Sequence, residues 1–323
     1  MSEVITIGEP LVVFASEQPD ISLTDAEHFH KGIGGAELNV AIGARRLGHS
    51  VEYISQVGTG PMGKYVSKAI SNYKIGTNYL FSDNEHFTGM QFKQLVTRGD
   101  PDVINYRHGS AASYLSSGQI KAVDLSNTQI AHLTGIFPAI SKSALVAFEA
   151  LLSRLINNKI LVTFDTNLRP SLWKDRQTMI ESINHFASYA DIVLPGINEG
   201  KVLTNTNDPE KIADFYLHNS RTKVVMVKVG SRGSFVKIKT GEKSFIPGFK
   251  VKKVVDTVGA GDGFALGVIT ALLEGKSFKS AALRGNAIGA LQVQTPGDND
   301  GYPDKNELKK FFQKTEISQE SEA

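Results

Sequence analysis

The sequence contains no cysteine among its 323 residues. Disulfide bridges, thiolate zinc sites and cysteine nucleophiles are therefore excluded. The 35 basic residues nearly balance the 33 acidic residues, which gives a formal net charge of +2. This balance gives no electrostatic reason to expect nucleic acid or an anionic membrane surface as a partner.

Long apolar runs are also missing, and none approaches the roughly 20 residues that a membrane-spanning helix needs. The eight histidines form no metal-binding spacing. The start of the sequence, Met1–Val4, leads straight into an apolar stretch without a basic leader. We therefore expect a cytoplasmic protein, and its length allows one large α/β domain with a small appendage.

Strand and helix patterns alternate along most of the chain. A strand, a helix and a second strand are predicted at 4–8, 37–47 and 51–57. Further strands are predicted at 130–133, 159–165, 192–195 and 223–229, with helices between them. Repeated strand–helix–strand units predict a mainly parallel sheet covered by helices.

Two segments, at about 11–31 and 88–108, interrupt this alternation. In the second, apolar and polar residues alternate on both sides of a turn at 98–101, which predicts a β-hairpin. We expect both segments to form a small sheet whose apolar face covers the active site as a lid or joins two copies of the chain. Residues 1–313 then form one domain, and the polar segment 314–323 is predicted to be disordered.

The most informative stretch is DTVGAGDG at residues 256–263. The apolar residues from 249 to 255 before it predict a strand and its exit. The segment from Phe264 after it is too uniformly apolar for a surface helix, so a buried helix is expected to begin here.

The first turn of that helix has the composition of a phosphoryl-transfer site. Its backbone N–H groups have no partners within the helix and attract anions, and Gly259, Ala260 and Gly261 leave them accessible. Asp262 in the same turn is expected to contact a hydroxyl that attacks a phosphoryl group held there. The alternative is that Asp262 is simply a helix cap. We expect the positive pole of the helix to keep the pKa of Asp262 low.

A second glycine-rich string, GTGPMGK at residues 58–64, fits the first seven positions of a P-loop. The next residue is Tyr65, where a magnesium ligand requires a serine or threonine hydroxyl, and Pro61 removes one backbone N–H group. We therefore reject a nucleotide site here and expect a turn that leads into a helix.

The DTVGAGD string between strand and helix resembles the nucleotide-site signature of the ribokinase-like (PfkB-type) carbohydrate kinases, and the resemblance extends over about residues 8–310. It implies an α/β fold of the ribokinase-like class: a three-layer sandwich with a mainly parallel central sheet and a small β-sheet lid. It also implies ATP and Mg²⁺ as cofactors, with a monovalent cation possible. Asp262 would be the catalytic base, and Gly259, Ala260 and Gly261 would hold the phosphate.

The resemblance implies further nucleotide contacts. The strand and glycine turn at 228–233 resemble the ATP loop of the family, which places Lys228, Gly230, Ser231 and Gly233 at the nucleotide with Gly259 and Gly261. Asn286, Gly289 and the loop 295–298 fall where the family surrounds adenine. Glu199 matches the acid of the family's Asn-x-x-Glu magnesium motif, but Gly196 stands at the asparagine position, so Glu199 is expected to act through metal-bound water.

The string GGAELNVA at residues 34–41 resembles the sugar-binding signature of the family. It implies that the amides of Gly34 and Gly35 and the side chain of Asn39 reach substrate hydroxyls. From the residues themselves, a helix cap with an exposed Asn39 is an equal alternative.

Arg107 and Arg169 each follow a strand, and two guanidinium groups suit a carboxylate substrate. Pairing with surface acids is the commoner fate of an arginine. The strings GEPL at 8–11, YRHGSAAS at 106–113 and FDTNLRPSLW at 164–173 resemble the 2-keto-3-deoxygluconate kinases of the family. This implies that Tyr106, Arg107 and Arg169 contact a sugar acid, although Asn105 stands where that branch often has a tyrosine.

The resemblance thus predicts an ATP-dependent kinase that converts 2-keto-3-deoxygluconate into 2-keto-3-deoxy-6-phosphogluconate. A kinase of a neutral sugar such as fructose or ribose is one alternative, and a non-catalytic sugar-acid-binding protein on the same fold is another. The expected partners are the sugar acid and ATP, together with a second copy of the chain in a homodimer or higher oligomer through the lid sheet.

Overall fold

The computed structural model describes residues 2–97 and 101–320. Met1 and most of the turn predicted at 98–101 therefore lie outside the described residues. No helix in this described part is long and apolar enough to cross a membrane.

The main sheet of the described chain has nine strands in the order β13-β12-β11-β10-β9-β8-β1-β4-β5. All neighbours from β5 to β11 are parallel, whereas β11, β12 and β13 pair antiparallel at one edge. The mainly parallel sheet predicted from the sequence is confirmed. The strands are β1 (Val4–Ile7), β4 (Val51–Gly58), β5 (Leu80–Asp83), β8 (Ile130–Thr134), β9 (Leu161–Asp165), β10 (Ile192–Val193), β11 (Val224–Lys228), β12 (Gly233–Ile238) and β13 (Lys243–Pro247).

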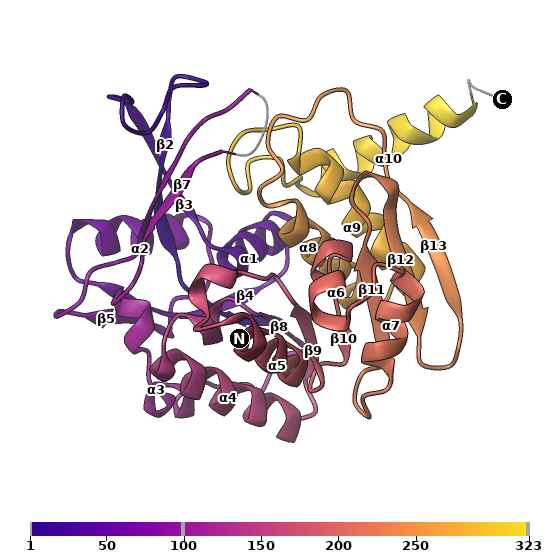
Figure 1. Cartoon of the computed structure of the whole chain (residues 1–323), viewed down its shortest axis with the longest axis horizontal. Helices are drawn as coiled ribbons and strands as arrows, with labels where there is room; N and C mark the ends of the chain where they lie inside the picture. Colours follow the sequence, from indigo (N-terminus) through magenta and orange to yellow (C-terminus); the bar gives the residue numbers. More distant parts are fainter. Residues whose placement is uncertain (1, 98–100, 321–323) are drawn as a thin grey trace.

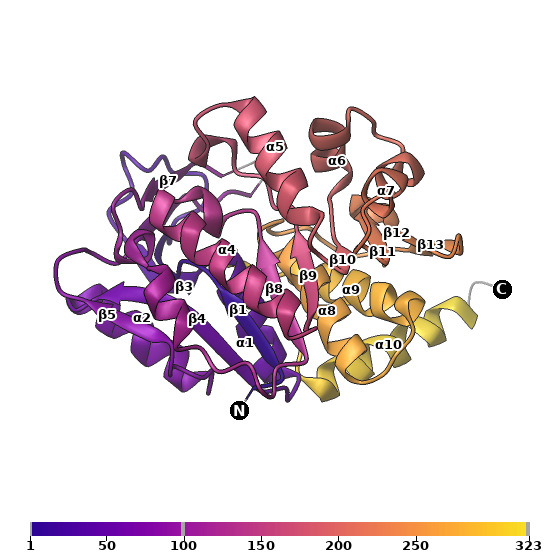
Figure 2. The same ribbon diagram turned by 90° about the horizontal axis from the view of Figure 1, so that it is seen from below.

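Helices cover both faces of this sheet and bury a separate apolar core on each face. Side chains alternate between the faces, so Val4 and Tyr53 belong to one core and Ile5 and Ile54 to the other. The first core lies under α1 (Ala36–Arg46), α2 (Pro61–Asn72), α8 (Ala260–Leu273), α9 (Phe278–Gln292) and α10 (Lys305–Glu320). The second lies under α3 (Ser117–Lys121), α4 (Lys142–Asn157), α5 (Arg176–Ala187), α6 (Ile197–Thr204) and α7 (Pro209–Leu217). Figure 2 shows the resulting three layers, with α5, α6 and α7 on the opposite side from α1, α8 and α10.

Short 3-10 helices connect several of these elements. They are η1 (Ala111–Tyr114), η2 (Phe137–Ala139), η3 (Pro170–Leu172) and η4 (Gly230–Arg232).

Four strands in the order β3-β2-β6-β7 form the small sheet, which projects from the main body at the upper left of Figure 1. They are β2 (Leu11–Ser16), β3 (Phe29–Gly34), β6 (Met90–Lys93) and β7 (Val103–Tyr106). The antiparallel pairing of β6 with β7 confirms the predicted hairpin. Because side chains alternate along each strand, Lys93 and Asn105 lie on one face, the inner face. The other face, the outer face, carries Phe14, Phe29, Phe92, Ile104 and Tyr106.

The segment between β13 and α8 departs from the prediction. The sequence predicts a strand at 249–255, but β13 ends at Pro247 and the chain from 248 to 257 contains neither helix nor strand. The N–H groups of Val255 and Asp256 donate instead to the carbonyl oxygen of Val293, the C-cap residue of α9, at 2.7 and 3.4 Å. The strand prediction is wrong because this segment bonds to the C-terminal end of a helix rather than to the sheet edge.

Two further predictions concern the turn before α2 and the C-terminal segment of the chain. The turn at 58–60 does lead into helix α2, in which Pro61 is the first residue. At the end of the chain, α10 continues to Glu320, into the segment 314–323 for which the sequence predicts disorder. Residues 321–323 of that segment lie outside the described residues.

Candidate active site

Asp262 lies in the first turn of α8, where two amides hold its carboxylate. Its Oδ2 accepts a hydrogen bond from Asn39 Nδ2 at 2.9 Å, and its Oδ1 accepts one from Asn167 Nδ2 at 3.3 Å. The residue is only 9% exposed. Arg107 and Lys228, two basic residues predicted for the site, form their ion pairs with other acids. The two hydrogen bonds that orient the carboxylate therefore come from neutral amides.

Burial raises the pKa of Asp262 above its ordinary value. The hydrogen bond from Asn39 and the charges of Arg169 and Lys228 act in the opposite direction but do not outweigh burial. The expectation that the helix pole keeps this pKa low is therefore wrong, because the cost of desolvating the carboxylate is larger. A carboxylate with a raised pKa is a better proton acceptor near neutral pH.

Asn39 is itself oriented by a third amide. Asn299 Nδ2 donates to Asn39 Oδ1 at 3.0 Å, so the NH₂ group of Asn39 faces Asp262. The alternative of an exposed Asn39 is wrong, since Asn39 is 2% exposed. Asn167 lies within the string at 164–173, although no role was predicted for it, and Asn299 lies in none of the predicted strings. Asn39 therefore orients the carboxylate of Asp262 through this hydrogen bond. Its contact with substrate remains a prediction.

The glycine turn before α8 has the geometry of an anion site. Gly259 is the N-cap of α8 in the left-handed region, with φ 78°, and a Cβ atom there would lie 1.9 Å from the carbonyl oxygen of Asp298. Only glycine fits this position. Among the described residues, the N–H groups of Gly259 and Gly261 have no hydrogen-bond partner, whereas that of Ala260 makes a long bond of 3.4 Å to Thr257. These N–H groups are available for a phosphoryl oxygen.

A cavity of about 340 Å³ opens beside this turn. Seven of the eight residues predicted to bind nucleotide line it, namely Lys228, Gly230, Ser231, Gly233, Gly261, Asn286 and Gly289. Gly259 is not among the lining residues, and the loop 295–298 predicted around adenine lines a different cavity, on the side of the small sheet. The apolar side chains of Phe249, Val251 and Val254 complete the wall. The cavity suits a flat base with its phosphates directed at the turn.

Asn286 fixes one side of this cavity rather than offering its amide freely. Its Nδ2 donates to the carbonyl oxygens of Ile246 and Pro247, both at 3.1 Å. The residue therefore ties α9 to β13 and maintains the shape of the cavity.

Lys228 at the end of β11 forms a buried ion pair that the sequence did not reveal. Its Nζ lies 2.8 and 2.7 Å from the two carboxylate oxygens of Asp165 at the end of β9. Burial works against the charged form of Lys228, but the charges of Asp165 and Glu199 outweigh it and raise its pKa. The ammonium group thus stays protonated at the edge of the nucleotide cavity, where it favours phosphate.

Glu199, the predicted magnesium residue, is engaged by protein donors. Its carboxylate accepts hydrogen bonds from the N–H of Gly196 at 2.6 Å, the N–H of Leu168 at 2.8 Å and the hydroxyl of Thr166 at 2.8 Å. Burial raises its pKa, but the charge of Lys228 and these hydrogen bonds lower it more, so the group remains ionised. Its geometry is that of a helix cap for α6.

Arg107 forms an ion pair with Glu9, on the same side of the small sheet as the inner face. Arg107 Nε donates to Glu9 Oε2 at 2.7 Å, and its second guanidinium nitrogen lies 2.5 Å from the same oxygen. Glu9 is 2% exposed and also accepts a hydrogen bond from Ser110 Oγ at 2.5 Å. Arg169 is exposed, and its described hydrogen bond is to the carbonyl oxygen of Leu168. Arg169 is therefore the guanidinium that remains free to meet a substrate carboxylate.

Tyr106 is not brought together with Arg107. It lies on the outer face, where its ring meets Phe92 edge-on with centroids 5.8 Å apart, and it is 54% exposed. Asn105 occupies the inner face instead and accepts a hydrogen bond from Gln91 at 3.0 Å. The alternation of side chains along β7 separates the two residues that the sequence strings placed together.

Gly34 and Gly35 lie where β3 enters α1, as predicted. A Cβ atom on Gly34 would lie 2.6 Å from the carboxylate of Asp298, and Gly35 adopts φ 127° as the N-cap of α1. The string predicted to bind sugar therefore adjoins the loop that also packs on Gly259.

The described residues include no group of three or more His, Asp or Glu side chains that could hold a metal ion. Asp165 and Glu199, which act electrostatically on Lys228, are carboxylates that would orient the water ligands of a magnesium ion bound to the phosphates of ATP. Such an ion would neutralise negative charge on the phosphates.

Comparison with known proteins identifies the family. The model of the pfkB family of carbohydrate kinases matches residues 1–305. The chain is 41% identical over 311 residues to the 2-dehydro-3-deoxygluconokinase of Bacillus subtilis, covering 96% of this chain and 95% of the relative. Among solved structures, a PfkB protein from Polaromonas sp. JS666 superposes with a TM-score of 0.86 at 39% identity, covering 96% and 99% of the two chains.

A ribokinase II candidate from E. coli, solved in complex with ATP and Mg²⁺, superposes with a TM-score of 0.87 at 25% identity, covering 97% of this chain and 100% of that one. The fold, the glycine turn and the family match agree with one another. This chain belongs to the pfkB family of carbohydrate kinases.

Proposed function

We propose that the protein is an ATP-dependent kinase of 2-keto-3-deoxygluconate, the compound also named 2-dehydro-3-deoxygluconate. The kinase activity is supported above all by the position of Asp262 beside the free N–H groups of Gly259 and Gly261 at the N-terminus of α8. The acid substrate is supported by the exposed Arg169 and by the name of the relative that is 41% identical over nearly the whole chain.

In the proposed reaction the terminal hydroxyl of the sugar acid attacks the γ-phosphorus of ATP. A bond forms between the hydroxyl oxygen and phosphorus, the bond to the β–γ bridging oxygen breaks, and ADP leaves. Asp262 accepts the hydroxyl proton, and the N–H groups of Gly259 and Gly261 bind the transferring phosphoryl oxygens. Lys228 places positive charge beside the nucleotide phosphates. We place this reaction in the cytoplasm, where cells keep ATP.

The residues proposed to hold the two substrates follow from the cavity and its neighbours. Lys228, Gly230, Ser231, Gly233, Gly261 and Gly289 line the nucleotide side. On the sugar side, Gly34, Gly35, Asn39 and Arg169 are proposed contacts, with Arg107 contributing through the hydrogen-bond donors that Glu9 leaves free. We exclude Tyr106 from the sugar site, because it lies on the outer face of the small sheet.

A monovalent cation stays a prediction from the family resemblance.

We further propose that the protein is a homodimer through the outer face of the small sheet. Ile104 and Tyr106 on this face are 46% and 54% exposed, and the rings of Phe14 and Phe92 stack beside them with centroids 5.0 Å apart. An aromatic patch of this kind is typical of a protein interface.

Phosphorylation assays separate this proposal from its alternatives. Purified protein should consume ATP with 2-keto-3-deoxygluconate and yield the 6-phosphate, detected by mass spectrometry, with little turnover of fructose or ribose.

Asp262→Asn should bind ADP normally yet lower kcat by about 10² to 10⁴ because the proton acceptor is lost. Arg169→Ala should raise KM for the sugar acid without raising KM for ATP. Preferred turnover of fructose or ribose would favour a neutral-sugar kinase, and binding of the acid without phosphoryl transfer would favour a non-catalytic protein.

A further inference from the structure

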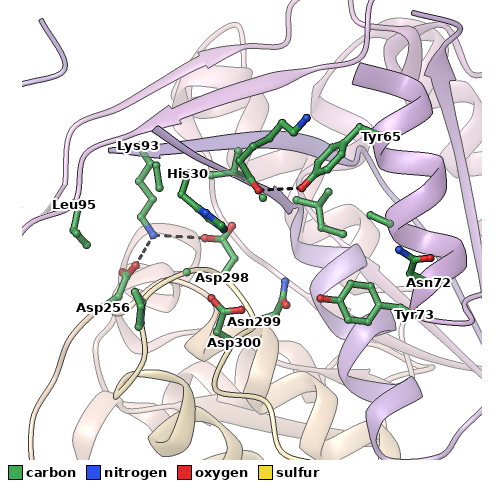
Figure 3. Close-up of a pocket in the computed structure, with 18 of the residues that line it drawn as sticks. His30, Tyr65, Asn72, Tyr73, Lys93, Leu95, Asp256, Asp298, Asn299 and Asp300 are labelled. Atoms are coloured by element: carbon green, nitrogen blue, oxygen red, sulfur yellow. Dashed lines mark hydrogen bonds and ion pairs between the residues drawn. The ribbon is translucent and has the colours of Figure 1, made fainter. Parts of the chain in front are cut away.

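Lys93 is a buried lysine that connects the small sheet to the loops around the glycine turn. It is the last residue of β6, and its side chain is 7% exposed on the inner face. Its Nζ forms an ion pair with Asp256 Oδ2 and lies 3.5 Å from Asp298 Oδ1 (Figure 3). A lysine buried to this degree requires such partners.

Asp256 shapes the glycine turn directly. While Oδ2 faces Lys93, Oδ1 accepts a hydrogen bond from the N–H of Val258 at 3.0 Å. This bond folds the chain back just before Gly259. The position of the ammonium group of Lys93 therefore bears on the path of the chain that presents the phosphate-binding N–H groups.

Asp298 supports the same turn from its other side. Its carbonyl oxygen packs on the α-carbon of Gly259, and its carboxylate lies against Gly34. Within the main domain, Gln292 Nε2 already joins the two loops by donating to the carbonyl oxygens of Val258 at 3.2 Å and Gly297 at 2.7 Å. Lys93 adds the connection from both loops to the small sheet.

The charges around Lys93 make this connection necessary. Asp256 and Asp298 are two carboxylates served by one ammonium group, and the charge of Asp262 also acts on Asp298. Burial, together with Asp262 and Asp256, raises the pKa of Asp298 to about 6, whereas Lys93 lowers it. Without the ammonium group, burial and the neighbouring carboxylates would raise the pKa of Asp298 further, and the ion pair that connects both loops to β6 would be lost.

The ion pair also stands between cavities. Lys93 and Asp256 line both a cavity of about 520 Å³ beside α2 and another of about 290 Å³. The second cavity meets the nucleotide cavity at Val254 and Thr257. Lys93 thus connects the small sheet to residues that adjoin the wall of the nucleotide cavity.

On the basis of the proposed kinase function, we propose that Lys93 is a positioning residue that couples the small sheet to the glycine turn. When the sheet closes on the sugar acid, Lys93 holds Asp256 and Asp298 in the arrangement that aims the N–H groups of Gly259 and Gly261 at the phosphate. Binding of the sugar acid and binding of nucleotide then strengthen each other.

The test compares ADP affinity with and without the sugar acid by isothermal titration calorimetry. In the wild type, saturating 2-keto-3-deoxygluconate should lower the Kd of ADP at least about fivefold, at the low end of typical coupling. In Lys93→Met this ratio should fall to about one, the Kd of the sugar acid at saturating ADP should rise by the same factor, and kcat should drop at least tenfold. Lys93→Arg, which keeps the charge, should retain part of the coupling.

Lys68→Met is the matched control, because Lys68 lines the same 520 Å³ cavity from the exposed side of α2. It should keep the wild-type ratio and kcat. If Lys93→Met does not fold, as judged by circular dichroism, Lys93→Gln takes its place. An unchanged ratio and kcat in the folded variant, or no coupling in an active wild type, would overturn the proposal. A wild type that does not phosphorylate the sugar acid would instead refute the proposed function.

Discussion

Glu37 is a buried carboxyl group in the first turn of α1, within electrostatic reach of Asp262. It is 1% exposed, and its Oε1 accepts a hydrogen bond from Thr134 Oγ1 at 2.5 Å. Burial raises its pKa from 4.5 to about 7, and the charge of Asp262 adds to this effect. Glu37 is therefore largely protonated in the folded protein at slightly acidic pH, where the same group in the unfolded chain is ionised.

This difference predicts how Glu37 affects stability. Because its folded pKa is raised, its contribution is fully present below pH 4.5 and is lost as the pH rises through 7, a loss of roughly 3 kcal/mol. Glu37→Gln cannot ionise, so its free energy of unfolding should fall less between pH 5 and pH 8 than that of the wild type. Urea unfolding at the two pH values measures this.

The matched control for this change is Glu149→Gln, which removes an exposed carboxyl group on α4. It should leave the pH dependence of the wild type unchanged. Equal pH dependence in Glu37→Gln and the wild type would contradict the interpretation.

Among single residues, the sequence located those that belong to contiguous strings and missed their distant partners. The composition of residues 256–263 indicated Asp262 and the glycines, because the amides and the acid are adjacent in the chain. The Asn299–Asn39 hydrogen bond joins residues 260 positions apart, and the Lys93–Asp256 pair joins residues 163 apart. No local pattern encodes such contacts, so the environment that raises the pKa of Asp262 was also unpredictable.

Helix α8 has a glycine in the left-handed region at each end, with different surroundings. Gly259 at its start has φ 78° and its α-carbon touches the carbonyl oxygen of Asp298. Gly275 after its end has φ 71° and has open space around its α-carbon. A side chain at either position would therefore strain the backbone, but only a side chain at Gly259 would also clash with a neighbouring residue.

Alanine at each position separates these effects. Gly275→Ala should cost about 1 to 2 kcal/mol in the free energy of unfolding, from backbone strain alone, and leave ADP affinity unchanged. Gly259→Ala must also displace the backbone at Asp298, so it should weaken ADP binding at least about tenfold. Calorimetric titration with ADP and urea unfolding provide the two measurements. Normal ADP affinity in Gly259→Ala would show that the turn is not the phosphate site.

Helices and strands could be predicted where the hydrophobic pattern of the sequence matches the burial of the side chains in the fold. The parallel strand β1 is a continuous apolar stretch except for Thr6, and the β6–β7 hairpin alternates as a sheet with one polar face should. The segment 249–255 has the composition of a strand, but β13 already pairs with β12, and Val255 bonds to Val293, the C-cap residue of α9, instead. Propensity was outweighed there by a tertiary contact that the sequence does not display.

Viewed as a whole, the molecule uses the two faces of its small sheet for different purposes. The inner face directs Lys93 and Arg107 toward the main domain, whereas the outer face exposes aromatic and aliphatic side chains. A sheet of four short strands has little core of its own. Contact with a second copy on the outer face would stabilise the sheet, and with it the inner face that the proposed sugar site requires.

The proposed dimer has a direct test in Ile104→Asp, which places a charge on the outer face at the edge strand β7. Light scattering during size-exclusion chromatography should give about twice the chain mass of 35.0 kDa for the wild type and a single chain mass for the variant. Val146→Asp on α4 is the control, since Val146 is similarly exposed at 44% but lies on the main domain. It should remain dimeric. A monomeric wild type, or an Ile104→Asp variant that stays dimeric at micromolar concentration, would contradict the assignment of the outer face as the interface.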